Sequence, residues 1–165
     1  MARIPSWLGS RRLRLASGLV LFTYLTTHYL NHALGLVSRQ ALDRGSEVFL
    51  FVWRNPLGSL LLYGALTIHM LLALWALYQR RSFKGLTGPE WTQLLLGLSV
   101  PPLIVAHLLG TRIANLLYGT FDSYSYVLLN LWVFQPWEGV IQVSAFLAAW
   151  IHGCLGLRGW MRLKP

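Results

Sequence analysis

Five histidines are the side chains of this sequence with the most evident chemistry. They are His28, His32, His69, His107 and His152, and each lies inside a long apolar run rather than in a loop. A single histidine in an apolar helix more often forms hydrogen bonds than binds a metal. Several histidines at matched depths change that expectation, because imidazole is also a common metal ligand.

The histidines fall at two depths when the basic clusters are placed on one side of a membrane. At 1.5 Å per helical residue, His28 and His107 lie about 21 and about 25 Å from the inner ends of their runs. His69 and His152 lie about 16 and about 15 Å from the basic residues that close theirs. Two pairs from different helices are what two bis-histidine haems require, whereas a zinc site gathers three or four ligands at one point.

Residues beside three of these histidines are small, as a flat porphyrin ring against a helix would require. The alternative is that small residues simply allow close packing between helices. The small residues are Ala65 and Ala73 beside His69, Ala148, Ala149 and Gly156 beside His152, and Gly110 and Thr111 beside His107.

In the first apolar run, spacing does not decide which histidine binds iron, because His28 and His32 are one turn apart and share a helix face. The histidine that does not bind iron could form a hydrogen bond with a haem propionate or a quinone. Asn31 and Arg112 are further candidates for propionates, with helix capping and snorkelling as their ordinary roles. The one cysteine, Cys154, excludes a disulfide framework and a CxxCH attachment motif, so the sequence predicts two haem b groups held without covalent bonds.

Composition shows which elements must position these side chains. The 165 residues are 55% hydrophobic and only 12% charged, which is typical of an integral membrane protein. Four runs are long enough for a hydrocarbon core of about 30 Å. They are Leu15 to Val37, Leu57 to Tyr78, Trp91 to Tyr118 and Val140 to Met161, the third bent or locally unwound at Pro101 and Pro102.

Two shorter apolar pieces, Val48 to Trp53 and Tyr124 to Phe134, are predicted as interfacial helices, with a fifth span at the second as the alternative. Most Lys and Arg lie in the N-terminal arm, in the loop between the second and third runs, and in the tail with Lys164, which predicts that both termini are cytoplasmic. Four of the five acids, Asp122 among them, fall in the opposite loops. The predicted fold is therefore an all-α integral membrane bundle of four transmembrane helices with short interfacial helices.

The sequence is read as one domain, residues 1–165, without an internal repeat or a cleavable secretory signal. Its net charge of +9 could suggest nucleic acid. The basic residues cluster at the ends of apolar runs instead of along one polar face, so we expect a lipid bilayer and no nucleic acid as partner.

The segment His152 to Arg158 resembles the HGxxGLxR motif that closes the last helix of the dihaem cytochrome b subunit of fumarate reductases. The stretch IHMLLALWALYQRR around His69 is similar to a histidine helix of that subunit. Gly18, ten residues before His28, matches the spacing on its first haem-binding helix and favours His28 over His32 as ligand. The resemblance implies iron pairs of His28 with His107 and of His69 with His152, the pairs that depth also gives.

A closer resemblance is to the membrane anchors of certain bacterial class III adenylate cyclases. It covers RLRLASGLVLF, LTTHYLNHALG, AHLLGTRIAN, DSYSYVLLNLWV and WIHGCLGL. The resemblance implies a multi-pass protein of the bacterial inner membrane, a homodimer, and a cytoplasmic cyclase domain in the same polypeptide after Pro165. This chain itself would then be a redox-responsive or quinone-responsive regulatory anchor and not an enzyme.

Arg14 and Ser17 loosely resemble the Arg and Ser near quinone in succinate dehydrogenase anchors. Their ordinary explanations, a basic flank and a helix-start residue, are favoured. Two other functions compete with the cyclase anchor. One is an electron-transferring cytochrome b subunit of a succinate dehydrogenase or fumarate reductase type of quinone oxidoreductase. The other is a peptide or lipid receptor without haem.

Overall fold

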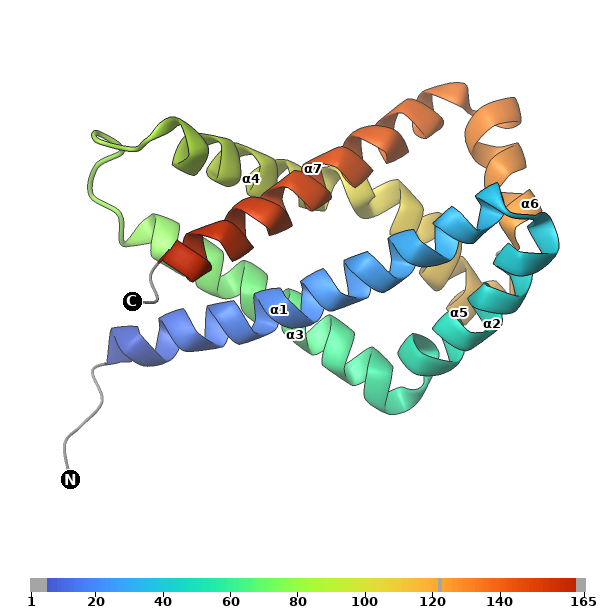
Figure 1. The fold of residues 1–165 in the computed structure, drawn as a ribbon, viewed down its shortest axis with the longest axis horizontal. Helices are drawn as coiled ribbons and strands as arrows, with labels where there is room; N and C mark the ends of the chain where they lie inside the picture. The colour runs from blue at the N-terminus through green and yellow to red at the C-terminus, as the bar shows by residue number, and fades with distance from the viewer. Residues whose placement is uncertain (1–5, 122, 163–165) are drawn as a thin grey trace. The chain divides into compact units, whose positions relative to one another are not determined.

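The structure, a computed structural model, describes residues 6–121 and 123–162, and all regular elements in these ranges are helices. The chain divides into two compact units, Met1–Lys84 and Gly85–Pro165. Each unit consists of a long helix, a shorter helical segment and a second long helix, and the two long helices of each unit pack against each other (Figure 1). Asp122 and Lys164, used above to orient the chain, lie outside the described residues.

The first unit contains α1 and α3 as its long helices. Its elements are α1 (Ser6–Ala33), the 3₁₀ turn η1 (Leu34–Leu36), α2 (Arg39–Arg54) and α3 (Pro56–Tyr78). Ser38 caps α2 by accepting a hydrogen bond from the Ala41 amide, and Asn55 caps α3 by accepting one from the Gly58 amide. These two caps fix the sharp turns that bring α2 and then α3 back along α1.

The second unit is built on the same order of elements. They are α4 (Gly88–Leu108), the π-helix η2 (Leu109–Ile113), α5 (Ala114–Tyr118), α6 (Tyr124–Leu128), the π-helix η3 (Leu129–Phe134) and α7 (Pro136–Arg162). Thr87 and Glu90 form a capping box at the start of α4. Gly119 ends α5 with a φ of 65°, a left-handed conformation that glycine adopts at little cost.

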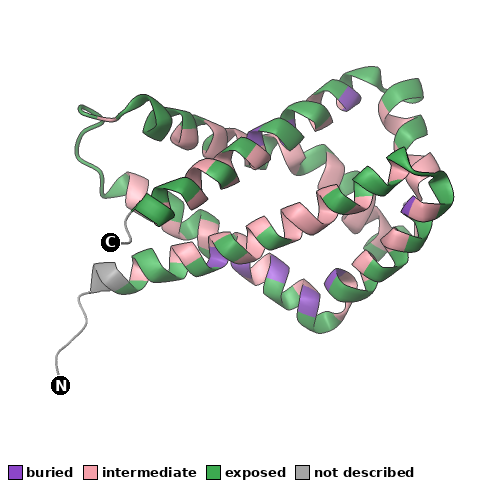
Figure 2. Cartoon of the chain, in the orientation of Figure 1, coloured by how far each residue is buried: buried purple, intermediate pink, exposed green. Residues whose placement is uncertain are grey.

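Within residues 6–121 and 123–162, three helical segments are long and apolar enough to cross a membrane: Pro56–Tyr78, Gly88–Tyr118 and Pro136–Arg162. α1 is long enough but less apolar, because threonine, histidine and asparagine occupy its second half. Few of the described residues are buried (Figure 2). Large apolar side chains lie exposed along the long helices. This surface suits a lipid environment, in which apolar exposure carries no cost.

Two predictions about the elements need correction. The first interfacial helix starts at Arg39 rather than near Val48, because Ser38 caps it there. Of the two alternatives predicted at Pro101 and Pro102, local unwinding is wrong, because α4 continues helically through both residues and the first departure from α geometry is η2. The bend stays a prediction. Two missing donors are tolerated inside a long helix when the rest of its hydrogen bonds persist.

Candidate functional site

His69 lies on α3 and faces the first third of α1. Its Nδ1 donates a hydrogen bond to the carbonyl oxygen of Arg14 at 3.1 Å and lies 3.4 Å from Oγ of Ser17. Gly18 provides the space for the ring, since a Cβ at that position would lie 3.0 Å from Cε1 of His69. The imidazole is therefore held against bare backbone of α1.

His152 lies on α7 and faces α4 in the same manner. Its Nδ1 donates a hydrogen bond to the carbonyl oxygen of Gln93 at 2.9 Å. Gly97 lies next to the ring, and a Cβ there would come within 2.6 Å of Cε1, closer than real Cβ contacts allow. Gly97 is thus required by this packing more strictly than Gly18.

Both contacts fix the tautomer of the ring. A carbonyl oxygen can only accept, so Nδ1 of His69 and of His152 must carry the proton. The lone pair of a neutral ring is then on Nε2, and a backbone acceptor at Nδ1 is a common way in which proteins orient a metal-binding histidine. The donor chemistry and the glycine beside each ring fit one axial imidazole per unit for a haem.

His28 and His32 lie at the end of α1 in an aromatic cluster. The ring of His28 stacks on Tyr24 at 5.6 Å between centroids, lies 5.4 Å from Phe49 of α2, and meets the His32 ring edge-on at 4.5 Å. Trp53 contacts Tyr24 and donates from Nε1 to Thr27 at 3.2 Å. The structure brings both candidate histidines together and does not choose between them.

His107 lies in the last turn of α4, and Arg112 lies within η2. The carbonyl oxygen of His107 accepts a hydrogen bond from Oγ1 of Thr111 at 2.6 Å. Arg112 is half-buried, and its Nε has no hydrogen-bond partner among the described residues. A guanidinium donor without a protein acceptor fits a propionate or another anionic group better than it fits simple snorkelling.

Asn31 and Ser17 have structural roles that the sequence did not reveal. Asn31 donates to Oγ of Ser46 at 2.9 Å and so joins α1 to α2. Ser17 is buried, and its Oγ donates within α1 to the carbonyl oxygens of Leu13 and Arg14. The interpretation of Ser17 as a helix-start residue was wrong, because α1 begins at Ser6, almost three turns earlier.

The small residues beside the histidines include two that are buried. Ala65 and Ala148 are each 4 residues before their histidine and are 7% and 5% exposed. Leu62 and Ala145, each 7 residues before, are buried as well. These positions share the helix face of His69 or His152, so the face that packs on the partner helix is the one that carries the ring.

The two units repeat one register of functional residues. His28 follows Gly18 by ten residues, and His107 follows Gly97 by ten. In each unit, the histidine of the second long helix donates to the carbonyl of the residue 4 before that glycine. The repeat makes His28 the counterpart of His107, whereas Thr111 stands at the position of His32.

Gly97 and Gln93 were not identified as site residues from the sequence. The spacing from Gly97 to His107, identical to the spacing from Gly18 to His28, was the signal that could have identified Gly97. Gln93 contributes only its backbone carbonyl, for which a sequence carries no signal. Among the described residues, no group of three or more His, Cys, Asp or Glu could hold a metal ion. This finding is evidence against a zinc-type site there, and it does not test an iron held by two histidines.

Comparisons with protein-family models, with curated proteins and with solved structures found no match to this chain.

Proposed function

We propose that this chain is a haem-binding membrane anchor that carries two haem b groups and regulates an attached class III cyclase domain. The observation that carries the proposal is the repeated site, in which His69 and His152 each donate Nδ1–H to a backbone carbonyl beside a glycine. The geometry occurs in both units, and a backbone acceptor at Nδ1 is a common way in which a metal-binding histidine is oriented. When bound, haem supplies a one-electron change in charge.

The proposed ligand pairs are His28 with His107 and His69 with His152. Their support is the predicted depth and the resemblance to dihaem cytochrome b. The repeat adds support for His28, because it occupies the position that His107 occupies in the second unit. Arg112 is the proposed partner of a propionate, and Asn31 and His32 are the remaining polar groups at the same end of α1. A quinone near Arg14 and Ser17 rests on the resemblance alone.

We also propose that α1 is a fourth span and that both termini face the cytoplasm. α1 has 28 residues and so reaches about 42 Å. Its threonines reduce the cost of lipid exposure, because Thr23, Thr26 and Thr27 donate their hydroxyls to carbonyl oxygens of α1 itself. Cysteines introduced at Ser10 and at Ser38 should face opposite sides of the membrane. A membrane-impermeant thiol reagent should therefore label one of them in intact vesicles and the other in inverted vesicles. Labelling of both cysteines in the same vesicles would exclude a span.

The haem proposal is tested by visible spectra of the detergent-purified protein, oxidised and dithionite-reduced, with a pyridine haemochrome assay. We expect a low-spin b-type spectrum and about two haems per chain. A colourless protein that does not take up added haem would refute the proposal and favour the receptor function.

A second candidate function is the cytochrome b subunit of a respiratory quinone oxidoreductase. The segment from His152 to Arg158 favours it, because it resembles the motif of the fumarate reductase subunit. The genomic reading frame separates the two functions. Continuation past Pro165 into a cyclase domain supports the anchor and its proposed dimer, whereas a stop codon beside genes for a flavoprotein and an iron-sulfur protein supports the oxidoreductase.

A further inference from the structure

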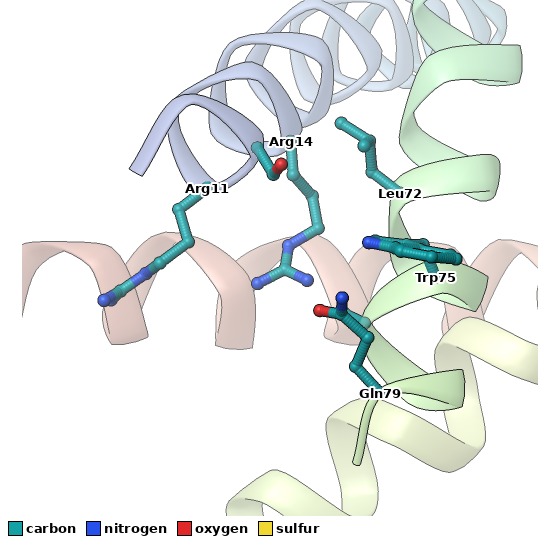
Figure 3. A pocket seen from close by; sticks show the side chains of 7 residues that line it. Arg11, Arg14, Leu72, Trp75 and Gln79 are labelled. Carbon is teal, nitrogen blue, oxygen red and sulfur yellow. The ribbon is translucent and has the colours of Figure 1, made fainter. Parts of the chain in front are cut away.

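A cavity of about 330 Å³ lies between the first turns of α1 and the last turns of α3. Its polar lining is Ser10, Arg11 and Arg14 from α1 and Gln79, the residue that caps the end of α3. Figure 3 shows the guanidinium of Arg14 and the amide of Gln79 converging beside the indole of Trp75, with Arg11 farther along α1. All of these residues belong to the first unit, so the cavity is complete within it.

The electrostatics of this cavity favour an anion. No described carboxylate forms an ion pair with Arg11 or Arg14, and none lines the cavity. A bound anion would relieve the repulsion between the two guanidiniums, and Gln79 could donate a further hydrogen bond to it.

The remainder of the lining is apolar and suits a hydrocarbon chain. Leu72, Trp75 and Ala76 form this side of the cavity. An apolar strip of α3 adjoins it through Trp75, and its members Leu71, Leu74, Trp75 and Tyr78 are 56%, 47%, 51% and 82% exposed. The ligand that matches both sides is an amphiphile with an anionic head.

The cavity lies where such an amphiphile is abundant. Trp75 and Tyr78 stack at 5.7 Å, as aromatic side chains do at a membrane interface, and three basic residues follow before residue 85. Basic cavities between helices on the cytoplasmic side bind lipid head groups in other membrane proteins. This placement rests on the proposed orientation of the termini and is independent of haem.

We propose that this cavity binds the phosphate group of an anionic phospholipid, with Arg11 and Arg14 as its charge partners and Gln79 as a hydrogen-bond donor. The acyl chains then lie along Leu72, Trp75 and the exposed face of α3. The site is selective for lipids with a net negative head group, because a zwitterionic head group brings its own cation to the two guanidiniums.

The test uses the full chain in nanodiscs of equal parts phosphatidylglycerol and phosphatidylcholine, transferred to mild detergent. Native mass spectrometry then counts the phospholipid that each protein molecule retains. We expect retention of phosphatidylglycerol over phosphatidylcholine, and a decrease of about fivefold in Arg14→Gln. Arg14→Lys keeps the charge and should retain more lipid than Arg14→Gln.

The matched control is Arg12→Gln, which removes an equal charge from the same helix but does not line the cavity. Unchanged retention in this variant, together with loss in Arg14→Gln, supports the site. Equal loss in both variants would show a diffuse electrostatic effect and overturn it. Circular dichroism confirms that each variant is folded, and haem content measured on the same samples keeps this result separate from the haem proposal.

Competition identifies the ligand. Millimolar inorganic phosphate should leave the retained phosphatidylglycerol in place, because the acyl chains supply part of the binding. Displacement by phosphate would show a site for a free anion, and displacement by an uncharged quinone would show a quinone site. Either result would overturn the lipid proposal.

Discussion

The first and second units place a histidine against bare helix backbone in the same way, but they surround it with different side chains. His69 has the hydroxyl of Ser17 at 3.4 Å, whereas the matching position beside His152 is Leu96. Gly97 is in tighter contact with its ring than Gly18. The shared backbone carbonyl and glycine orient the imidazole. The differing neighbours, Ser17 and Leu96, would give the two imidazoles different surroundings.

The short helical segments differ more than the long ones. In the first unit, α2 is a regular helix that two side-chain hydrogen bonds join to α1, one from Asn31 and one from Trp53. In the second unit, the segment Tyr124–Phe134 is partly π-helical, and the hydroxyl of Tyr126 lies at the long distance of 3.5 Å from the Gly110 carbonyl. The two units are therefore closely alike around the histidines and differ in their short helical segments.

Removal of the repeated histidines gives the largest expected effect. His69→Ala and His152→Ala should each lose the same haem, reducing haem per chain from two to about one, because an iron with one axial imidazole is bound far more weakly. Pyridine haemochrome assays and redox titration measure the content and identify which haem remains. His32→Ala is the control and should keep both haems. Full haem content in either alanine variant would disprove the ligand assignment.

A methyl group at the glycines tests the difference in packing. Gly97→Ala should destabilise the protein by about 1–3 kcal/mol through overpacking against His152. Gly18→Ala should cost less, because its Cβ would lie farther from the ring. Thermal unfolding in detergent measures both. Gly64→Ala, which meets nothing within 4 Å, should be neutral or stabilising. Equal costs at the two glycines would contradict the tighter contact at Gly97.

The hydrogen bonds of the short segments give a smaller difference. Trp53→Phe removes the bond to Thr27 and should lower the stability of α2 by about 1 kcal/mol. Tyr126→Phe should change stability by less than about 0.5 kcal/mol, because a 3.5 Å contact contributes little. Amide hydrogen exchange of α2 and of residues 124–134 measures each local effect. A larger increase in exchange rate at residues 124–134 of Tyr126→Phe than in α2 of Trp53→Phe would contradict this expectation.

Ser17→Ala should also have only a small effect on stability. Nδ1 of His69 keeps the Arg14 carbonyl as acceptor, so the loss is about 0.5 kcal/mol in thermal unfolding. The visible spectrum and midpoint potential of one haem should shift slightly while haem content stays at its full value. Ser144→Ala, whose hydroxyl bonds only its own helix, is the control and should leave the spectrum unchanged. Loss of a haem in Ser17→Ala would assign this hydroxyl a much larger role.

The sequence was sufficient to predict an all-helical chain with long apolar segments, because apolar runs of about 20 residues have few alternative structures. It also placed each histidine on a helix, as the structure confirms. In the part of the chain that the structure describes, three helical segments qualify as membrane-crossing candidates, and α1 is not among them because its polar residues lower its hydropathy. The four-span count, the orientation and the haem pairs stay predictions.

The contacts of the site could be predicted only in part. The glycine spacing was visible in the sequence, but the acceptors of His69 and His152 are backbone carbonyls, whose partners depend on how two helices pack. Helix starts were also hidden: the basic turns before Leu15 continue α1, so Ser17 became a buried mid-helix residue. The internal repeat escaped notice because the matched pairs are offset by 79 residues on the first long helices and by 83 on the second.

The boundary between Lys84 and Gly85 has a consequence for protein engineering. It lies in a loop that contains Gly85 at a φ of 81° and precedes the capping box of α4. Each side of this loop keeps a whole pair of long helices with its own histidine, glycine and carbonyl. A gene divided at this loop would therefore leave each of the two polypeptides with a complete pair of packed long helices and its own histidine contact.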